Sequence, residues 1–211
     1  MPDMTYKLEA LKETIKDGER ELLFLNISYP VFENEKQSEK EERLNEFYQK
    51  GAGEFEKFCK TKLSAKLKTE CRGKCAAVMQ TQVPFIDGKS ASVITDVYFF
   101  DGKSRKERRF ADNWLLSEKY PRVLKANAAF PVSRRAKKLY TDEICSKIMT
   151  AEGGFSYFSD AVLSAKKHFD ENRFYLTPKG VAFYYEKGLL CPEKEGSPAF
   201  VIPYKAIEKL I

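Results

Sequence analysis

Three Asp-Gly pairs mark hairpin turns along this chain, and they constrain its fold more than any other feature. Asp17-Gly18, Asp87-Gly88 and Asp101-Gly102 each stand between two β-prone runs. An Asp-Gly pair in this position is a strong hairpin signal, because both residues tolerate the positive φ of a tight two-residue turn. The strands on either side of each pair should therefore run antiparallel.

The β-prone runs form two blocks in the first half of the chain. Residues 6–15 and 21–32 should pair as an N-terminal hairpin. Residues 75–86, 90–100 and 106–115 should form an antiparallel meander, since Asp-Gly turns join them and the middle strand has one largely β-branched face and one mixed face.

Between these blocks, the hydrophobic period changes from two to about 3.6 residues, which predicts a long helix over residues 38–70. Ser38 and Glu41 form a capping box at its start. Gly51 and Gly53 predict a kink, since an interior glycine costs about 1 kcal/mol relative to alanine. The apolar side chains expected to form its buried stripe are Leu44, Phe47, Tyr48, Phe55, Phe58, Leu63 and Leu67.

The second half of the chain mixes helical and strand patterns. The expected elements are a helix capped by Ser133, a short helix over 157–170, a hairpin over 174–176 and 181–185, a strand over 199–203 and a helical turn over 204–210. Because the strands come in blocks, we predict an α+β fold. One long helix and two or three shorter helices should pack on a largely antiparallel β-sheet.

Length and composition limit the class of protein. A chain of 211 residues that is 43% hydrophobic can bury a sizeable core. Five scattered cysteines favour reduced thiols over a disulfide framework. No secretory signal or membrane-spanning apolar stretch is visible, so we expect a cytoplasmic protein. The net charge of +6 is modest and interspersed, and it predicts only weak affinity for anionic surfaces.

Two segments near the C-terminus resemble a known family. Residues 172–185, NRFYLTPKGVAFYY, and residues 196–207, GSPAFVIPYKAI, are similar to the end of the RsiV-type domain of unknown function. That domain forms the extracellular part of an anti-sigma factor that senses lysozyme, and it also accompanies a peptidoglycan deacetylase. Residues 25–32, LNISYPVF, resemble the N-terminal companion segment that usually precedes it.

The resemblance implies a division into a hairpin plus long helix at residues 1–72 and an RsiV-type α+β domain at 73–211, together forming one compact unit. It implies a binding or sensing module with a protein or cell-wall-derived ligand, and it supplies no catalytic residue. An extracellular or lipid-anchored location is the corresponding alternative to a cytoplasmic one. Two turns depart from the family pattern. Residues 100–105 lack a His that members commonly carry, and residues 187–192 replace an aromatic-acidic-apolar-Pro run.

Two basic clusters are the candidate sites for an anion or a partner. The strand cluster comprises Arg105, Lys106, Arg108 and Arg109, and the helix cluster comprises Arg134, Arg135, Lys137 and Lys138. Positive charge at the start of a helix costs roughly a few tenths of a kcal/mol per residue, because it opposes the helix dipole. The position of the helix cluster therefore favours a role in binding an anion or an acidic partner, which would offset this cost. A solvated face is the alternative reading of both. Neither cluster interleaves with aromatic residues, and we expect no nucleic-acid partner.

Catalytic and metal-site patterns are weak. His168 is the single histidine and stands near a helix end, which favours a capping or surface role over general base catalysis. Cys71 and Cys75 lack further paired ligands for a metal and are expected to be inert or merely oxidisable, with redox sensitivity as the alternative. No strand-to-helix turn has the glycine pattern of a phosphate-binding loop, so no cofactor is expected.

We therefore predict a non-catalytic binding or sensing domain and no enzyme. The alternative is a carbohydrate or peptidoglycan hydrolase that uses paired carboxylates around Asp96 and Asp112, which would require both carboxyl groups in one cleft. A third possibility is anionic-polymer binding, which predicts that affinity falls steeply with salt.

Overall fold

The computed structural model describes residues 4–34, 39–70, 73–116 and 120–210, which form an α+β protein with two β-sheets. The strands are β1 (Thr5–Asp17), β2 (Arg20–Glu33), β3 (Cys75–Ile86), β4 (Ser90–Phe100), β5 (Arg105–Leu115), β6 (Arg122–Val123), β7 (Phe174–Thr177), β8 (Gly180–Tyr184) and β9 (Ala199–Pro203). The helices are α1 (Glu39–Phe58), α2 (Ser64–Glu70), α3 (Ala126–Ala129), α4 (Arg134–Met149), α5 (Ala161–Lys167) and α6 (Tyr204–Glu208).

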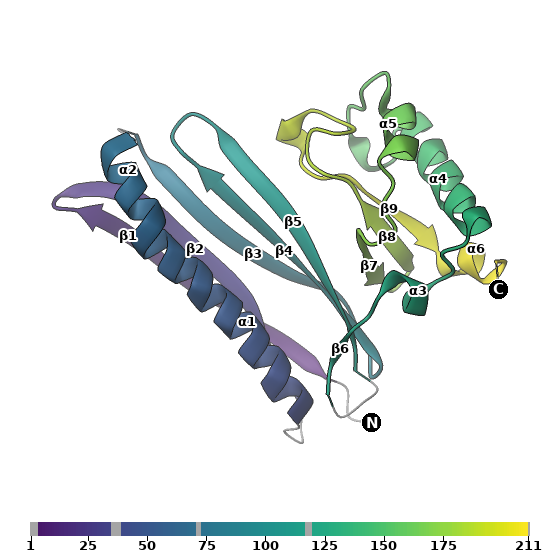
Figure 1. Ribbon diagram of the computed structural model, residues 1–211, viewed down its shortest axis with the longest axis horizontal. Coiled ribbons are helices and arrows are strands. Elements are labelled where there is room, and N and C mark those ends of the chain that lie inside the picture. The colour runs from purple at the N-terminus through teal and green to yellow at the C-terminus, as the bar shows by residue number, and fades with distance from the viewer. Residues whose placement is uncertain (1–3, 35–38, 71–72, 117–119, 211) are drawn as a thin grey trace.

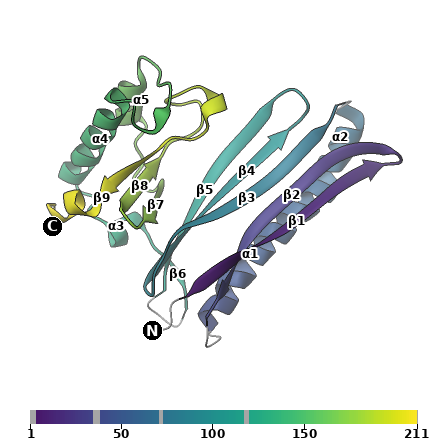
Figure 2. The same ribbon diagram turned by 180° about the vertical axis from the view of Figure 1, so that it is seen from behind.

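The two sheets each carry their own helices. The large sheet has the strand order β1-β2-β3-β4-β5-β6, and the small sheet has the order β7-β8-β9. The long helix α1 lies on one face of the large sheet, and α4 and α5 lie on the outer side of the small sheet (Figure 1). Seen from behind, β1 and β2 lie in front of α1, so the helix covers only one face of this hairpin (Figure 2).

The N-terminal hairpin forms as predicted, with antiparallel pairing from Thr5↔Glu33 to Asp17↔Arg20. Helix α1 continues through Gly51 and Gly53, so the kink expected there was wrong. The helical irregularity lies instead at Cys59–Leu63, a π-helical turn that leads into α2.

The predicted N-cap Ser38 lies outside the described residues. Within those residues, no helix is long and apolar enough to cross a membrane.

The chain returns through α1 and α2 to place β3 beside β2 in parallel. Their register runs from Leu23↔Cys75 to Ile27↔Met79. The other neighbours in the large sheet are antiparallel, including the predicted meander β3-β4-β5, so the sheet is largely antiparallel as expected. The division at residue 72 stays a prediction, and β2 and β3 pair across it.

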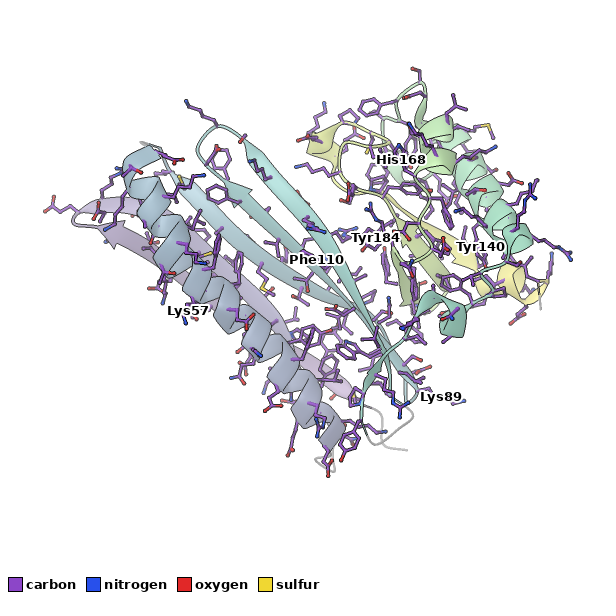
Figure 3. The ribbon with its side chains drawn as sticks, in the orientation of Figure 1. Lys57, Lys89, Phe110, Tyr140, His168 and Tyr184 are labelled. Atoms are coloured by element: carbon purple, nitrogen blue, oxygen red, sulfur yellow. The ribbon has the colours of Figure 1, made fainter. Side chains whose placement is uncertain are left out.

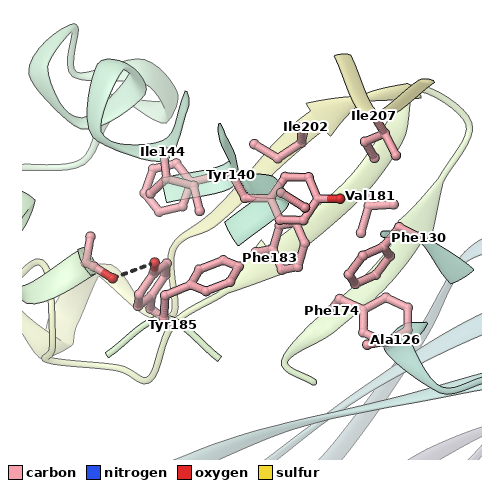
Figure 4. Packing of buried hydrophobic residues seen from close by; sticks show 14 of the residues in the cluster. Ala126, Phe130, Tyr140, Ile144, Phe174, Val181, Phe183, Tyr185, Ile202 and Ile207 are labelled. Atoms are coloured by element: carbon pink, nitrogen blue, oxygen red, sulfur yellow. Dashed lines mark hydrogen bonds between the residues drawn. The ribbon is translucent and has the colours of Figure 1, made fainter. Parts of the chain in front are cut away.

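The small sheet packs on α4 and α5 through an aromatic core (Figure 4). Phe183 lies 5.2 Å from Tyr140 and 5.3 Å from Phe130, measured between ring centroids. The Tyr185 hydroxyl donates to the Ala165 carbonyl oxygen at 3.0 Å. Ser133 caps α4 as predicted, because its side chain accepts a hydrogen bond from the Ala136 amide. The terminal hairpin is therefore anchored to two helices.

Side chains of the large sheet bind the open edge of β7. The Leu176 amide donates to Ser92 Oγ at 2.9 Å, and Asn113 Nδ2 donates to the Phe174 carbonyl oxygen at 2.8 Å. Ser92 Oγ in turn donates to Asn113 Oδ1 at 2.6 Å. This network, which we call the seam, satisfies backbone groups that a buried strand edge would otherwise leave without partners.

Candidate functional site

The strand cluster is divided by its internal contacts. Arg109 lies opposite Asp96 in the β4–β5 ladder, and two of its nitrogens donate to the Asp96 carboxylate at 2.7 Å each. A third nitrogen donates to the Ser197 carbonyl oxygen at 3.3 Å. Arg109 therefore joins the large sheet to the segment that leads into β9, and its charge is already paired.

The other members of the strand cluster are exposed. Arg105 lies 3.9 Å from the centroid of the Tyr98 ring and forms an ion pair of 3.0 Å with Glu107. Arg108 lies 5.1 Å from the centroid of the Phe110 ring. Lys106 is exposed and sits opposite Phe99 in the ladder. Within the described residues Arg108 makes no ion pair, so its charge is available to a ligand.

The carboxylates of the hydrolase alternative lie on opposite faces of the large sheet. Asp96 shares a face with Arg109, whereas Asp112 accepts a hydrogen bond of 3.5 Å from the Tyr48 hydroxyl of α1 on the other face. Successive side chains of a strand point to opposite faces, which separates positions 109 and 112. These two residues therefore do not form the carboxylate pair that the hydrolase alternative requires.

The helix cluster lies at a different place from the strand cluster. All four of its side chains are exposed on the first turns of α4. Lys138 forms an ion pair of 2.7 Å with Asp142, and the Lys137 amine lies 5.7 Å from the centroid of the Phe169 ring. Arg135 borders a hollow that also contacts Lys209, and no strand-cluster residue lines this hollow. The structure does not bring the two clusters together on one surface.

A cleft of about 560 Å³ lies between the edge of β5 and the segment that follows β8. This volume is in the range of small-molecule sites. Figure 3 shows Phe110 on β5 and Tyr184 on β8 at its two sides. Its characteristic lining residues are Glu107, Arg108 and Phe110 from β5 and Arg173, Tyr184 and Lys187 from the second half. The cleft is open along β5 because β6 pairs with this strand only at Trp114 and Leu115.

Ion pairs hold several polar side chains of the cleft, whereas Arg108 has none within the described residues. Lys187 Nζ lies 3.3 Å from Glu107 Oε2, with both side chains 11% exposed, and this pair links the two sides. Arg173 forms an ion pair of 2.9 Å with Glu186. Burial raises the pKa of Tyr184, so its hydroxyl stays protonated at neutral pH. The cleft offers fixed hydrogen-bonding groups beside two aromatic rings, and its carboxylates are held by cations.

The remaining titratable candidates show no catalytic arrangement in the described residues. His168 is exposed directly after α5, the surface position that the sequence predicts. No group of three or more His, Cys, Asp and Glu side chains in the described ranges could hold a metal ion. Cys71 lies outside those ranges, and Cys75 is buried with its sulfur 3.8 Å from the Gly73 carbonyl oxygen. Burial raises the pKa of Cys59 to about 11, which disfavours its thiolate.

The sequence did not indicate Arg173, Tyr184 or Lys187 as site residues. Its segment from 173 to 190 predicted only a hairpin, because the apolar members of that segment follow a strand pattern. The sequence held only a weak signal for a site at these positions. Arg173 precedes β7, Tyr184 ends β8, and Lys187 follows β8 within a few residues. Their approach to β5 depends on how the small sheet docks.

Comparisons with known proteins agree with the fold. Residues 130–205 match the family DUF3298, described as a protein of unknown function. A member of this family from Bacteroides fragilis NCTC 9343 has a similar structure, with 17% identity, a TM-score of 0.58, and coverage of 98% of this chain and 93% of that chain. A DUF3298 protein from Pseudomonas aeruginosa PAO1 gives 16% identity, a TM-score of 0.63, and coverage of 99% and 93%. No curated protein matches the sequence. The structural likenesses show the fold alone.

Proposed function

We propose that the protein is a non-catalytic binding domain whose ligand is a cell-wall-derived saccharide or glycopeptide, seated in the cleft between β5 and the segment after β8. The observation that carries this proposal is the set of polar side chains fixed by ion pairs beside Phe110 and Tyr184. Fixed donors and acceptors bind a polyhydroxylated ligand at a lower entropic cost than mobile ones. Aromatic rings supply the apolar faces on which a sugar ring can lie.

The size of the cleft favours this ligand over a protein partner, the other class that the sequence predicts. A specific protein interface buries roughly 800 Å² on each partner and covers many side chains. A cleft of about 560 Å³ instead matches a ligand of small-molecule size.

We also propose that the domain is of the RsiV type and that residues 25–32 belong to its companion segment. The match of residues 130–205 to DUF3298 supports only the coarser kinship. A cell-wall ligand favours the extracellular location over the cytoplasmic one. Affinity purification of the full-length protein from separate cytosolic and envelope fractions tests the compartment.

The cleft proposal is tested by titrating a soluble disaccharide-peptide fragment of peptidoglycan in a calorimeter. The test variant is Arg108→Ser, and the matched control is Lys106→Ser, a change of similar size on the same strand outside the cleft. A hydrogen bond to a charged group contributes about 1.5–3 kcal/mol, so Arg108→Ser should weaken binding about tenfold or more. The control should bind as the unmodified protein does. Absence of binding, or equal weakening in both variants, contradicts the proposal.

The helix cluster stays a proposed contact for an anionic or acidic partner. Its residues lie outside the cleft, so changing all four to Ser should leave the affinity for the peptidoglycan fragment unchanged. The same variant should lose affinity for any acidic partner that purifies with the full-length protein. Unchanged affinity for that partner would remove the helix cluster from the site.

A further inference from the structure

A second hollow lies on the opposite face of the large sheet, between α1 and strands β3 to β5. It has a volume of about 490 Å³ and a mostly apolar lining. The helix contributes Phe47, Gly51 and Phe55, and the sheet contributes Met79, Val97 and Phe110. Phe47 and Phe110 are 48% and 41% exposed, although the sequence predicted Phe47 as part of a buried stripe. We call this hollow the helix groove.

A carboxylate lies within this apolar surface. Asp112 lines the helix groove, and the only hydrogen bond that its carboxylate accepts in the described residues is the long one from the Tyr48 hydroxyl, at 3.5 Å. Trp114 Nε1 donates to the same Tyr48 hydroxyl at 2.7 Å and fixes its position. Burial raises the pKa of Asp112. A carboxylate that is partly removed from water without a cation is unfavourable, and a positive group beside it would offset that cost.

The charged neighbours of Asp112 leave room for such a group. Lys50 and Glu54 line the helix groove from α1, and they carry opposite charges. Lys125 borders a smaller hollow of about 230 Å³ that also contacts Asp112 and Phe47. None of these lysines lies within 4.0 Å of the Asp112 carboxylate in the described residues, so its charge is not paired.

We infer that the helix groove binds a small organic ammonium ion with an apolar body. The ammonium group would lie against the Asp112 carboxylate and the neighbouring aromatic rings, which attract cations through their faces. The apolar body would lie along Phe55, Met79 and Val97. This site shares Phe110 with the proposed saccharide cleft, but Asp112 and the other apolar side chains of the helix groove lie outside that cleft. The inference does not depend on the saccharide proposal.

Gly51 supports a binding role for the groove. A glycine inside a helix costs roughly 1 kcal/mol relative to alanine, and a Cβ atom built at Gly51 would meet no atom within 4 Å. Packing therefore does not require glycine here, and a longer side chain would occupy the groove. Gly53 has equally open surroundings but is exposed and does not line the groove. It provides a matched control position in the same helix.

The test uses phenethylamine and 2-phenylethanol, which have the same body but differ in charge, at pH 8. Binding is followed by NMR titration of the amide signals of α1, β4 and β5 in the full chain. Phenethylammonium should bind about tenfold more tightly than the alcohol, as expected for a hydrogen bond to a charged group. Asp112→Asn should reduce this preference to less than about twofold.

The two glycine variants separate binding in the groove from nonspecific adsorption. Gly51→Met should weaken phenethylammonium binding about tenfold or more, whereas Gly53→Met should bind as the unmodified protein does. Both changes favour the helix, so neither is expected to unfold the protein. Absence of saturable binding, equal affinity for the alcohol, or unchanged affinity in Gly51→Met would each overturn the inference. None of these outcomes depends on the peptidoglycan titration.

Discussion

Replacing Ser92 with Ala removes the hydroxyl group at the centre of the seam. Ser92 is fully buried, and its Oγ accepts from the Leu176 amide and donates to Asn113 Oδ1. The variant leaves both of these groups without that partner at the contact between the sheets. Asn113 also holds the Phe174 carbonyl oxygen, so the perturbation reaches two backbone positions of β7.

The magnitude follows from the two groups that lose a partner. A buried donor or acceptor left unsatisfied costs about 1–3 kcal/mol, so the loss of two partners in Ser92→Ala should lower the free energy of unfolding by about 2–6 kcal/mol. The whole free energy of unfolding of a native protein is roughly 5–15 kcal/mol, so this loss would be a large share of it. With a urea m-value of about 2–3 kcal/mol/M, the urea midpoint of unfolding should fall by about 1–3 M.

Urea unfolding followed by circular dichroism measures this change. Ser90→Ala is the matched control, because Ser90 lies two positions earlier on β4, is half-buried and has no side-chain hydrogen bond in the described residues. Its effect should stay within about 0.5 kcal/mol. Asn113→Ala should couple with Ser92→Ala by about 0.5–3 kcal/mol, since the two residues share one network. A Ser92→Ala variant as stable as Ser90→Ala would refute the role of the seam.

Two further changes test other parts of the structure. A Cβ atom at Gly180 would lie 2.1 Å from the Ile202 carbonyl oxygen, so Gly180→Ala should destabilise the protein by about 1–3 kcal/mol in thermal unfolding. The control Gly88→Ala should have little effect, because no atom lies within 4 Å of a Cβ atom built there. Equal melting temperatures for the two variants would contradict this prediction. Burial raises the pKa of Asp112 above the ordinary 3.8, so its stabilising contribution is present at low pH and is lost as the pH rises through the raised value. Asp112→Asn should therefore gain stability relative to the unmodified protein as the pH rises above about 4, and a difference that does not vary with pH would count against this reasoning.

Local signals predicted the individual strands well. The Asp-Gly pairs located the turns of the N-terminal hairpin and the meander, because turn residues act within a few positions of the chain. The Pro-Lys-Gly turn likewise located β7 and β8, and the predicted strand at 199–203 coincides with β9. These are features that neighbouring residues determine.

The sequence could not predict which surfaces meet. The stripe of α1 counted Phe47 and Phe58 as buried, but each is 48% exposed, because the helix covers only part of the sheet. Likewise, the sequence predicted Arg109 as a contact for a partner, but in the structure its guanidinium nitrogens donate hydrogen bonds to the Asp96 carboxylate and the Ser197 carbonyl oxygen. Charge and hydrophobicity patterns do not show which groups an element far along the chain will satisfy.

The parallel junction between β2 and β3 has a consequence for the order of folding. The N-terminal hairpin and the meander consist of contacts between neighbouring segments, and each can form as a local unit. The ladder that begins at Leu23 and Cys75 instead closes a long stretch of chain that contains α1 and α2. Such a closure loses chain entropy before its contacts stabilise the fold, which slows folding. We expect the pairing of β2 with β3 to limit the folding rate, so variants at paired positions of these two strands, such as Leu25 and Ala77, should slow refolding more than variants in β1 or β5.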